Sequence, residues 1–539
     1  MTTLDLPVPA RNATTTTRRV LAWIFPLSFA ILGLAALSLV GPSPASLVEG
    51  AQAGMALLVR AWPPTLADPM LTASHALQTI WMALAGTALG AILGALLGVL
   101  AAAATMPYRP IRSAAMAVIV ACRAIPDVVF AVFFVAAIGI GPLPGVLALG
   151  LHSIGMLGKL FSEAIDRTDD GVRDAFASTG GGPVQRLVAG VLPQVVPAFT
   201  ATVLYRLDIN FRQSVLLGAV GAGGLGLDLK TAFGFTDYRE ALGIAVVTVS
   251  LVLVVEGVAV LLRSLLVRAP SQRGRLPIRG TTVPWTRPRT VTHVAGWLGL
   301  LLVLLAAWQV GAGPAELWQT VVGTLDALGR FWPPNFAPIQ PILLAGLVQT
   351  CAIALGATAL GVLFGLPLGL LAAHGVAPPR VVAVARTVLV TLRSIPDLLL
   401  ILVFVAAFGL ALGAVAATCA LAVFTTAFVG KLVADAAEEI PYGTREALAS
   451  AGANRTQLLT TWLLGHLTPT LTGTILYGLD VNLRAFVVLG IVGAGDLGYA
   501  LSQHIRALNY DVVTAIVLPV FAIVLVVEVI STLLRRALR

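Results

Sequence analysis

The chain has 539 residues, of which 58% are hydrophobic and only 11% charged, and its mean hydropathy is +0.94. Soluble domains carry about 25% charged residues, so this composition excludes a soluble protein and indicates an α-helical protein with many membrane spans. The net charge is +9, but the arginines cluster at the ends of apolar segments. That pattern is typical of membrane topology rather than of nucleic-acid binding.

Hydropathy along the chain predicts six membrane spans in each half. In the first half they lie near residues 20–41, 73–104, 113–140, 143–165, 188–220 and 240–266. In the second half they lie near 292–311, 343–373, 381–410, 412–436, 459–491 and 512–534.

The sequence repeats itself after about half its length. R-A-I-P-D at Arg123–Asp127 returns as R-S-I-P-D at Arg393–Asp397, and Y-R-L-D-I-N-F-R at Tyr205–Arg212 returns as Y-G-L-D-V-N-L-R at Tyr477–Arg484. A period this long indicates a duplicated domain. We therefore predict an all-α polytopic membrane protein of tandem duplicated six-span halves, with about 12 transmembrane helices. The expected parts are a disordered tail at 1–17, a first half at 18–268, a linker at 269–290 and a second half at 291–539.

The linker is rich in arginine and proline, which predicts a cytoplasmic segment. An even number of spans in each half then places both termini in the cytoplasm and gives the halves the same orientation. The expected location is the cell membrane, with many passes. On the outer side, both halves carry W-P-P, at Trp62–Pro64 and Trp332–Pro334. These motifs fit a rigid interfacial turn or the ordinary tryptophan belt of a membrane protein.

A polar stretch recurs between the fourth and fifth spans of each half. It reads R-D-A-F-A-S-T-G at Arg173–Gly180 and R-E-A-L-A-S-A-G at Arg445–Gly452. Small residues before a glycine predict a short surface helix that ends in a turn, with a flat face that another protein can grip. Because the stretch occurs twice at matched positions, we expect it to couple to a partner. The predicted coupling residues are Asp174, Ala175, Ala177, Gly180, Glu446, Ala447, Ala449 and Gly452.

E-A-L-A-S-A-G at Glu446–Gly452 resembles the E-A-A loop of ABC importer membrane subunits, which docks into a cleft on a cytoplasmic ATPase. The first copy departs from that pattern with Asp174 and with G-G-G-P at Gly180–Pro183. A closer resemblance, to permeases of phosphonate importers, covers nearly all of each half. It is carried by A-C-R-A-I-P-D, G-K-L-F-S-E-A, V-L-P-Q, Y-R-L-D-I-N-F-R, G-A-V-G-A-G-G-L-G and the W-P-P loops. The family normally uses two separate permease copies, whereas this chain joins them.

The resemblance implies an importer permease that passes phosphonate, or a related phosphorus oxyanion, to the cytoplasm by alternating access. Its implied partners are two copies of a cytoplasmic ABC ATPase, an extracytoplasmic substrate-binding protein and membrane lipids, with no nucleic acid. The chain contains no G-x-x-x-x-G-K-[S/T] phosphate loop, so it is expected to be a transport subunit and not an enzyme. Cofactors are expected only as ATP and magnesium on the partner ATPase.

Ionisable residues inside spans are costly and mark functional candidates. Recurring sets predict a translocation pathway and, at the glycine-rich outer end of span five, a gate. An alternative is that the charges are satisfied structural pairs, which we favour for Lys159–Glu163 and Glu256–Arg263. The pathway candidates are Arg123, Asp127, Tyr205, Asp208, Asn210, Arg212, Arg393, Asp397, Tyr477, Asp480, Asn482 and Arg484. The gate candidates are Gly221, Gly223, Gly224, Gly493 and Gly495.

Other functions stay open on the sequence alone. The same kind of importer could carry phosphite, phosphate or methionine, because the glycine-rich turn is shared with methionine-type importers. A twelve-span secondary transporter is a different class. Against it, M-P-Y-R-P-I-R-S at Met106–Ser113 lacks the G-x-x-x-D-R-x-G-R-R pattern expected of a facilitator. A channel or scaffold would not need two matching docking loops.

Overall fold

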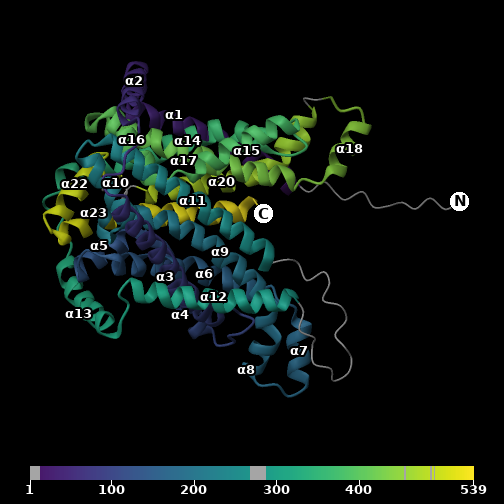
Figure 1. The fold of residues 1–539 in the computed structure, drawn as a ribbon. Coiled ribbons are helices and arrows are strands. Elements are labelled where there is room, and N and C mark those ends of the chain that lie inside the picture. Colours follow the sequence, from purple (N-terminus) through teal and green to yellow (C-terminus); the bar gives the residue numbers. More distant parts are fainter. Residues whose placement is uncertain (1–12, 267–286, 455–456, 486–488, 491, 539) are drawn as a thin grey trace. The chain divides into compact units, whose positions relative to one another are not determined.

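The structure, a computed structural model, describes residues 13–266, 287–454, 457–485, 489–490 and 492–538 (Figure 1). All elements that these residues form are helices, as expected for a membrane protein with many spans. The first helix begins at Ala13, inside the stretch expected to be a tail. Residues 1–12 and most of the predicted linker lie outside the described residues.

Seven long apolar helical segments can cross a membrane. They are α3 (Pro69–Ala101), α6 (Pro142–Asp166), the run from α8 to η2 (Pro183–Ala222), α11 (Tyr238–Leu266), α14 (Gln340–Ala372), α17 (Gly413–Glu438) and α23 (Tyr510–Leu538).

Three bent helix pairs raise the candidates among the described residues to ten. They are α1 (Ala13–Val40) with α2 (Pro44–Ala61), α4 (Arg109–Ala124) with α5 (Asp127–Ile138), and α15 (Pro379–Ser394) with α16 (Asp397–Phe408). The other two predicted spans correspond to α12 (Arg287–Gln309) and to η4 (Leu458–Leu464) with α20 (Gly465–Arg484). The predicted duplicated polytopic fold is confirmed.

The chain forms two compact units that draw helices from both sequence halves. The first unit contains residues 1–54, 340–500 and 518–539, and the second contains 55–339 and 501–517. In the first unit α1 packs on α14, with Gly33 against Ala359. In the second unit α12 packs on α3, and α13 (Pro314–Phe331) packs on α5. The opening helices of each sequence half therefore complete the unit built mainly from the other half.

Each unit is centred on a close helix pair, α3 with α6 or α14 with α17. Glycines four residues apart bring the backbones together. A Cβ on Gly90 would lie 2.3 Å from the Ser153 Cβ, and one on Gly361 would lie 2.4 Å from the Thr425 Cβ. The repeated glycines thus serve helix packing, as their spacing predicts.

The third predicted span of each half is broken at its proline. The chain bends by 88° between α4 and α5 and by 85° between α15 and α16. Pro126 and Pro396 each directly precede the second helix of the pair, so the predicted kink is confirmed. The prediction that Arg123 shares a helix face with Asp127 is wrong, because the break lies between them. The same correction holds for Arg393 and Asp397.

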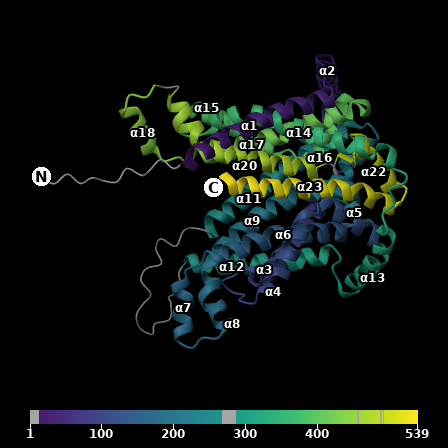
Figure 2. The same cartoon turned by 180° about the vertical axis from the view of Figure 1, so that it is seen from behind.

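Two helices on the predicted outer side were not anticipated, namely α2 and α13. Each follows a turn with a glycine of positive φ, Gly41 or Gly311, and each begins at a proline. Each ends close to a W-P-P motif, whose Trp62–Pro63 and Trp332–Pro333 bonds are cis. The two units divide α2 after Gly54. In Figures 1 and 2, the part of α2 that belongs to the first unit lies at the end of that unit opposite α18 (Tyr442–Ser450), and α13 lies at the end of the second unit opposite α7 (Asp170–Ser178).

Candidate functional site

The two predicted coupling stretches form short surface helices, α7 and α18. Each ends before a glycine of positive φ, with +80° at Gly180 and +83° at Gly452. The backbone N–H groups of Gly452 and Ala453 donate to the carbonyls of Ala449 and Leu448 and close the helix end. All predicted coupling residues are exposed: Asp174, Ala175, Ala177 and Gly180 on one unit, and Glu446, Ala447, Ala449 and Gly452 on the other. Each of the two helices therefore presents a small exposed face.

Each coupling helix packs on a π-helix that forms the first turns of the fifth span. In the first half, α7 packs on η1 (Arg186–Val191), where a Cβ on Gly190 would lie 3.3 Å from the Phe176 ring. The Arg186 Nε donates to the Gly181 carbonyl at 2.9 Å. In the second half, α18 packs on η4, and the Arg445 guanidinium lies 5.6 Å from the centre of the Trp462 ring. A π-helix contains an extra residue per turn and often marks a functional site. These contacts join each coupling helix to the start of its fifth span.

The predicted gate glycines form the turn after the fifth span. Positive φ values occur at Gly221, Gly223, Gly224, Gly493 and Gly495, which explains why side chains are absent there. In the first half the turn leads into α10 (Gly224–Gly234), and in the second it precedes α22 (Asp496–Arg506). A Cβ on Gly224 would lie 2.5 Å from the Thr79 Oγ1 of α3, so the turn is fitted closely to its neighbour.

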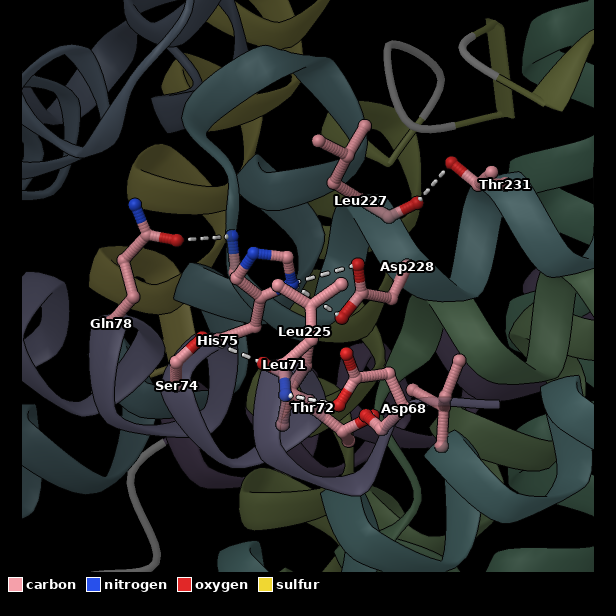
Figure 3. A network of polar contacts seen from close by, with 12 residues as sticks. Asp68, Leu71, Thr72, Ser74, His75, Gln78, Leu225, Leu227, Asp228 and Thr231 are labelled. Atoms are coloured by element: carbon pink, nitrogen blue, oxygen red, sulfur yellow. Dashed lines mark hydrogen bonds and ion pairs between the residues drawn. The ribbon is translucent and has the colours of Figure 1, made fainter. Parts of the chain in front are cut away.

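Three side chains of α3 hold the turn of the first half (Figure 3). The Gly224 N–H donates to the Gln78 Oε1 at 2.9 Å, and the Leu225 N–H donates to the Thr79 Oγ1 at 3.1 Å. The His75 Nδ1 lies 2.9 and 2.8 Å from the two carboxylate oxygens of Asp228 on α10. We call these three contacts the α3 clamp. The sequence analysis missed His75 and Asp228 because it considered only charged residues that recur in both halves, and these two occur in one half.

The matching turn of the second half is held differently. The Asp496 N–H donates to the Gln349 Oε1 at 2.8 Å, which repeats the glutamine contact. Gly346 and Ala500 occupy the positions that correspond to the histidine and the aspartate. A small cavity behind this turn is lined by Gln349, Ile353 and Leu489, among others. With Gly346 and Ala500 at these positions, the second turn has no side-chain counterpart of the His75–Asp228 contact.

Lys230 of α10 also faces the first outer turn. Its Nζ donates to the Ala219 carbonyl at 2.7 Å. Burial, and secondarily the positive charge of Arg506, lower the pKa of Lys230 below its ordinary value. Lys230 and Arg506 therefore lie close enough for their positive charges to repel one another.

The predicted pathway asparagines lie at three-helix junctions. Asn210 of α9 (Leu192–Leu217) is fully buried, and its Nδ2 donates to Thr87 of α3 and Ser153 of α6, both at 2.9 Å. In the second half, Asn482 of α20 donates to Thr358 at 2.8 Å and Thr425 at 2.9 Å. These amides join the fifth span to the central helix pair, a structural role that exists in both halves.

The predicted Asp–Arg pairs form on the fifth spans. The Arg212 Nη2 lies 2.8 Å from an Asp208 oxygen, and the Arg484 Nη2 lies 2.9 Å from an Asp480 oxygen. The shared helix face is confirmed for these pairs. Glu256 of α11, expected to pair with Arg263, lies 3.9 Å from the Arg212 guanidinium. Three charges therefore join the fifth and sixth spans of the first half.

Arg206 is a buried cation that sequence reasoning missed. It is 3% exposed, and its Nε donates to the Ser153 Oγ at 2.8 Å. The corresponding residue of the second half is Gly478. Y-R-L-D-I-N-F-R contains the arginine, but the requirement that a candidate recur in both halves discarded it. A charge inside a span was the signal that could have found it.

The remaining pathway candidates lie on the surface of the fifth spans or at the breaks of the third spans. Tyr205 and Tyr477 are 41% and 48% exposed on the surface of the fifth spans. Arg123 and Arg393 end the first helix of each broken span, and Asp127 and Asp397 begin the second. In the first half the break is held by α6, where a Cβ on Gly155 would lie 2.4 Å from the Arg123 backbone nitrogen. The part of the chain that the structure describes contains no group of three His, Cys, Asp or Glu residues able to hold a metal ion.

Duplicated spans, two exposed coupling helices and polar fifth spans define a membrane permease. The chain belongs to the family of the binding-protein-dependent transport system inner membrane component, whose model matches residues 94–271 and 365–539. It is a multi-pass inner-membrane protein and contains two fused copies of the family's domain. Permeases of this family work with an ATPase and a substrate-binding protein.

Two curated relatives and one solved structure are similar to this chain. The phosphate-import permease protein PhnE of Mycolicibacterium smegmatis is 43% identical over 92% of this chain and 91% of its own length. The phosphite transport system permease protein PtxC of Stutzerimonas stutzeri is 37% identical over 40% of this chain and 79% of its own. The inward-facing structure of the MetNI methionine ABC transporter shares 24% identity, covering 38% of this chain and 98% of its own, with a TM-score of 0.35.

Proposed function

We propose that this chain is the whole membrane-spanning part of an ATP-driven importer for a phosphorus oxyanion, phosphate or a phosphonate. The observation that carries the proposal is the pair of exposed coupling helices, each packed on the π-helix that begins a fifth span with an Asp–Arg pair. Such an arrangement connects a cytoplasmic engine to a membrane pathway twice within one chain.

The substrate class is supported by the relatives and by charge. The relatives named above are a phosphate-import permease and a phosphite transport permease, and a further relative from Escherichia coli K12 is described as a phosphonate transport permease. A phosphorus oxyanion is attracted to arginine, whose planar guanidinium matches two of its oxygens. Arg206 and Arg212 place such groups within the fifth span of one half.

The proposed mechanism is alternating access. ATP and magnesium bind on the two partner ATPases, which grip α7 and α18 and approach one another. The motion passes through η1 and η4 to the fifth spans, whose outer ends carry the glycine turns. The pathway then opens to the binding protein on one side and, after hydrolysis, to the cytoplasm on the other.

The complex with its ATPase and binding protein, reconstituted in vesicles, tests the proposal. Radiolabelled phosphate uptake is measured with ATP on the ATPase side, and unlabelled methylphosphonate, phosphite and methionine are added as competitors. We expect uptake that requires ATP, resists a protonophore and is inhibited by the phosphorus compounds. Inhibition by methionine and by none of the phosphorus compounds would indicate that the substrate is an amino acid rather than a phosphorus oxyanion. Uptake that needs a proton gradient and no ATP would support a secondary transporter instead.

The fused chain also sets the expected composition of the complex. Because it contains two docking faces, one copy should bind two ATPases. Native mass spectrometry of the purified complex measures this ratio directly. Two permease chains for two ATPases would contradict the proposal that each half couples to its own ATPase.

A further inference from the structure

The surfaces of α2 and α13 divide into three faces, which an ordinary helix on the surface of a soluble protein does not show. On α2 the large exposed apolar residues cover an arc of about 120° at 100° per residue. They are Leu47, Val48, Met55, Leu58 and Val59, followed by Trp62 beyond the helix end, and they are between 42% and 69% exposed. On α13 an arc of about 120° contains Trp318, Val321, Val322, Leu325 and Leu328, which are 51–69% exposed.

The second face of each helix packs on protein. On α2 it contains Gly50, where a Cβ would lie 2.4 Å from the Phe408 ring of α16. On α13 it contains Gly323, where a Cβ would lie 2.4 Å from the Ala137 carbonyl oxygen of α5. The small residues let each helix lie close against the second half of a broken span. The exposed apolar arc is therefore not the face that the fold uses for packing.

The third face is polar and exposed. On α2 it contains Glu49, Gln52 and Arg60, and on α13 it contains Gln319 and Asp326 with Arg330. At 100° per residue the faces follow one another in the same rotational order on both helices, apolar, then polar, then buried. The two sequences share few residues over this stretch, so the common order reflects a common environment with three sides.

The direction of α2 identifies that environment. The axis turns by 74° between Phe25–Val40 and Pro44–Ala61. Membrane spans are tilted by about 20° on average from the bilayer normal, so a helix bent this far lies close to the membrane plane. The helix before the bend, α1, also exposes large apolar residues, among them Leu32 and Leu39. A helix in that position meets protein on one side, lipid on another and water on the third.

We propose that α2 and α13 are interfacial helices that lie in the outer leaflet of the membrane, with their apolar arcs against the boundary between lipid headgroups and acyl chains. Aliphatic stripes with tryptophan at their ends are typical of helices in that zone. A soluble partner would instead favour a mixed surface, since interfaces between soluble proteins are about as apolar as the rest of a protein surface. The inference stands apart from the proposed function, because it does not depend on what is transported.

Site-directed spin labelling tests the proposal on the full chain in lipid nanodiscs with its ATPase. Cys122, Cys351 and Cys419 are first replaced by serine, and single cysteines are then introduced. The apolar-arc positions are Leu58→Cys and Leu325→Cys, and the matched controls on the polar faces are Gln52→Cys and Gln319→Cys. Collision with oxygen reports lipid, and collision with a water-soluble nickel chelate reports water.

We expect labels at the apolar arcs to be accessible to oxygen and shielded from nickel, and the polar-face labels to show the reverse, whether or not the binding protein is present. Nickel accessibility at Leu58→Cys and Leu325→Cys equal to that of the controls would overturn the proposal. Shielding of the apolar-arc labels that develops only after the substrate-binding protein is added would also overturn it, and would assign the arcs to that protein.

Discussion

The His75 imidazole of α3 lies 2.8 and 2.9 Å from the two carboxylate oxygens of Asp228 on α10, whereas the second half has Gly346 and Ala500 at the corresponding positions. The outer turn of one half is thus tied to the central helix pair by a contact that the other half lacks. If both outer turns open during transport, the first must break the His75–Asp228 contact, whereas the second has no such contact to break.

Loss of the histidine should loosen α10. We expect His75→Ala to speed amide hydrogen exchange over residues 217–234, because the carboxylate loses its partner across the α3 clamp. Asp228→Asn should have a similar effect, and the double variant should be no worse than either single one. Thr231→Ala is the control, because the Thr231 hydroxyl lies on the same helix and donates to the Leu227 carbonyl within it. Exchange unchanged from wild type in both single variants would show that the other clamp contacts are sufficient.

Bulky residues at the ends of the coupling helices should prevent ATPase docking. Gly180→Trp combined with Gly452→Trp adds side chains to open space, since neither glycine has an atom within 4 Å of a built Cβ. The left-handed backbone costs about 1–2 kcal/mol at each site, so the permease itself should stay folded. We expect loss of ATPase co-purification or uptake uncoupled from hydrolysis. Gly41→Trp, with a φ of +75° and equally open surroundings, is the control for strain alone. Normal transport by the double variant would rule out these faces as docking sites.

Substitutions of the charged residues around Arg212 can distinguish a structural role of these charges from a role in transport. Arg212→Gln alone should destabilise the protein by about 3–5 kcal/mol, because it leaves the Asp208 carboxylate without its main partner in a partly buried site. Because Glu256 also approaches Arg212, the compensated variant is Asp208→Asn with Arg212→Gln and Glu256→Gln. We predict that it recovers thermal stability but transports poorly. Uptake per folded complex equal to wild type would leave the three charges with a structural role only.

The buried asparagines should matter for stability. Asn210→Leu removes the hydrogen bonds to the hydroxyls of Thr87 and Ser153, so that each hydroxyl loses one of its partners. We expect this to cost about 2–3 kcal/mol of folding free energy. We expect a lower melting temperature and less folded complex, with unchanged uptake per folded complex. Asn482→Leu should behave in the same way, because its contacts match. A selective loss of uptake in the well-folded fraction would instead place Asn210 in the pathway.

Cutting the chain between its halves should not prevent assembly, but neither part should fold alone. We expect fragments 1–272 and 273–539, produced together, to co-purify through a tag on one of them. The reason is that each compact unit needs helices from both fragments. Each fragment produced singly should be degraded or aggregate. A first fragment that is stable by itself would show that α12 and α13 contribute little to their unit.

The sequence predicted the features that repeat and missed those that occur once. Periodic glycines, the proline breaks and the short coupling helices are local signals, and all are found where expected. The Asp208–Arg212 pair follows from a helical spacing of four residues. Arg206 and the clamp of His75 with Asp228 occur in one half only, so a search for repeated charges removed them. Their partners also come from distant helices, which spacing along the chain does not show.

Two helices were missed for another reason. Hydropathy averaged over the length of a span detects continuous apolar runs. In α2 and α13, apolar, polar and small residues are mixed along the sequence because they face three different sides of the helix. The Gly–Pro signals at Gly41–Pro44 and Gly311–Pro314 mark their starts. The exchange of helices between the two units also could not be predicted from the sequence. The repeat shows which segments correspond to one another, but not which segments are in contact.

That exchange of helices fixes an order of events during synthesis. The helix α1 ends at Val40, but its packing partner α14 begins at Gln340, which is 300 residues later. At about 5–20 residues per second, the ribosome needs about 15–60 s to reach the partner. During that time α1 must persist in the bilayer as a solitary span, with the face around Gly33 against lipid. The nascent protein therefore completes the unit of its first helix only as its last third is made, which gives the membrane's quality-control machinery a defined period in which to recognise an unfinished chain.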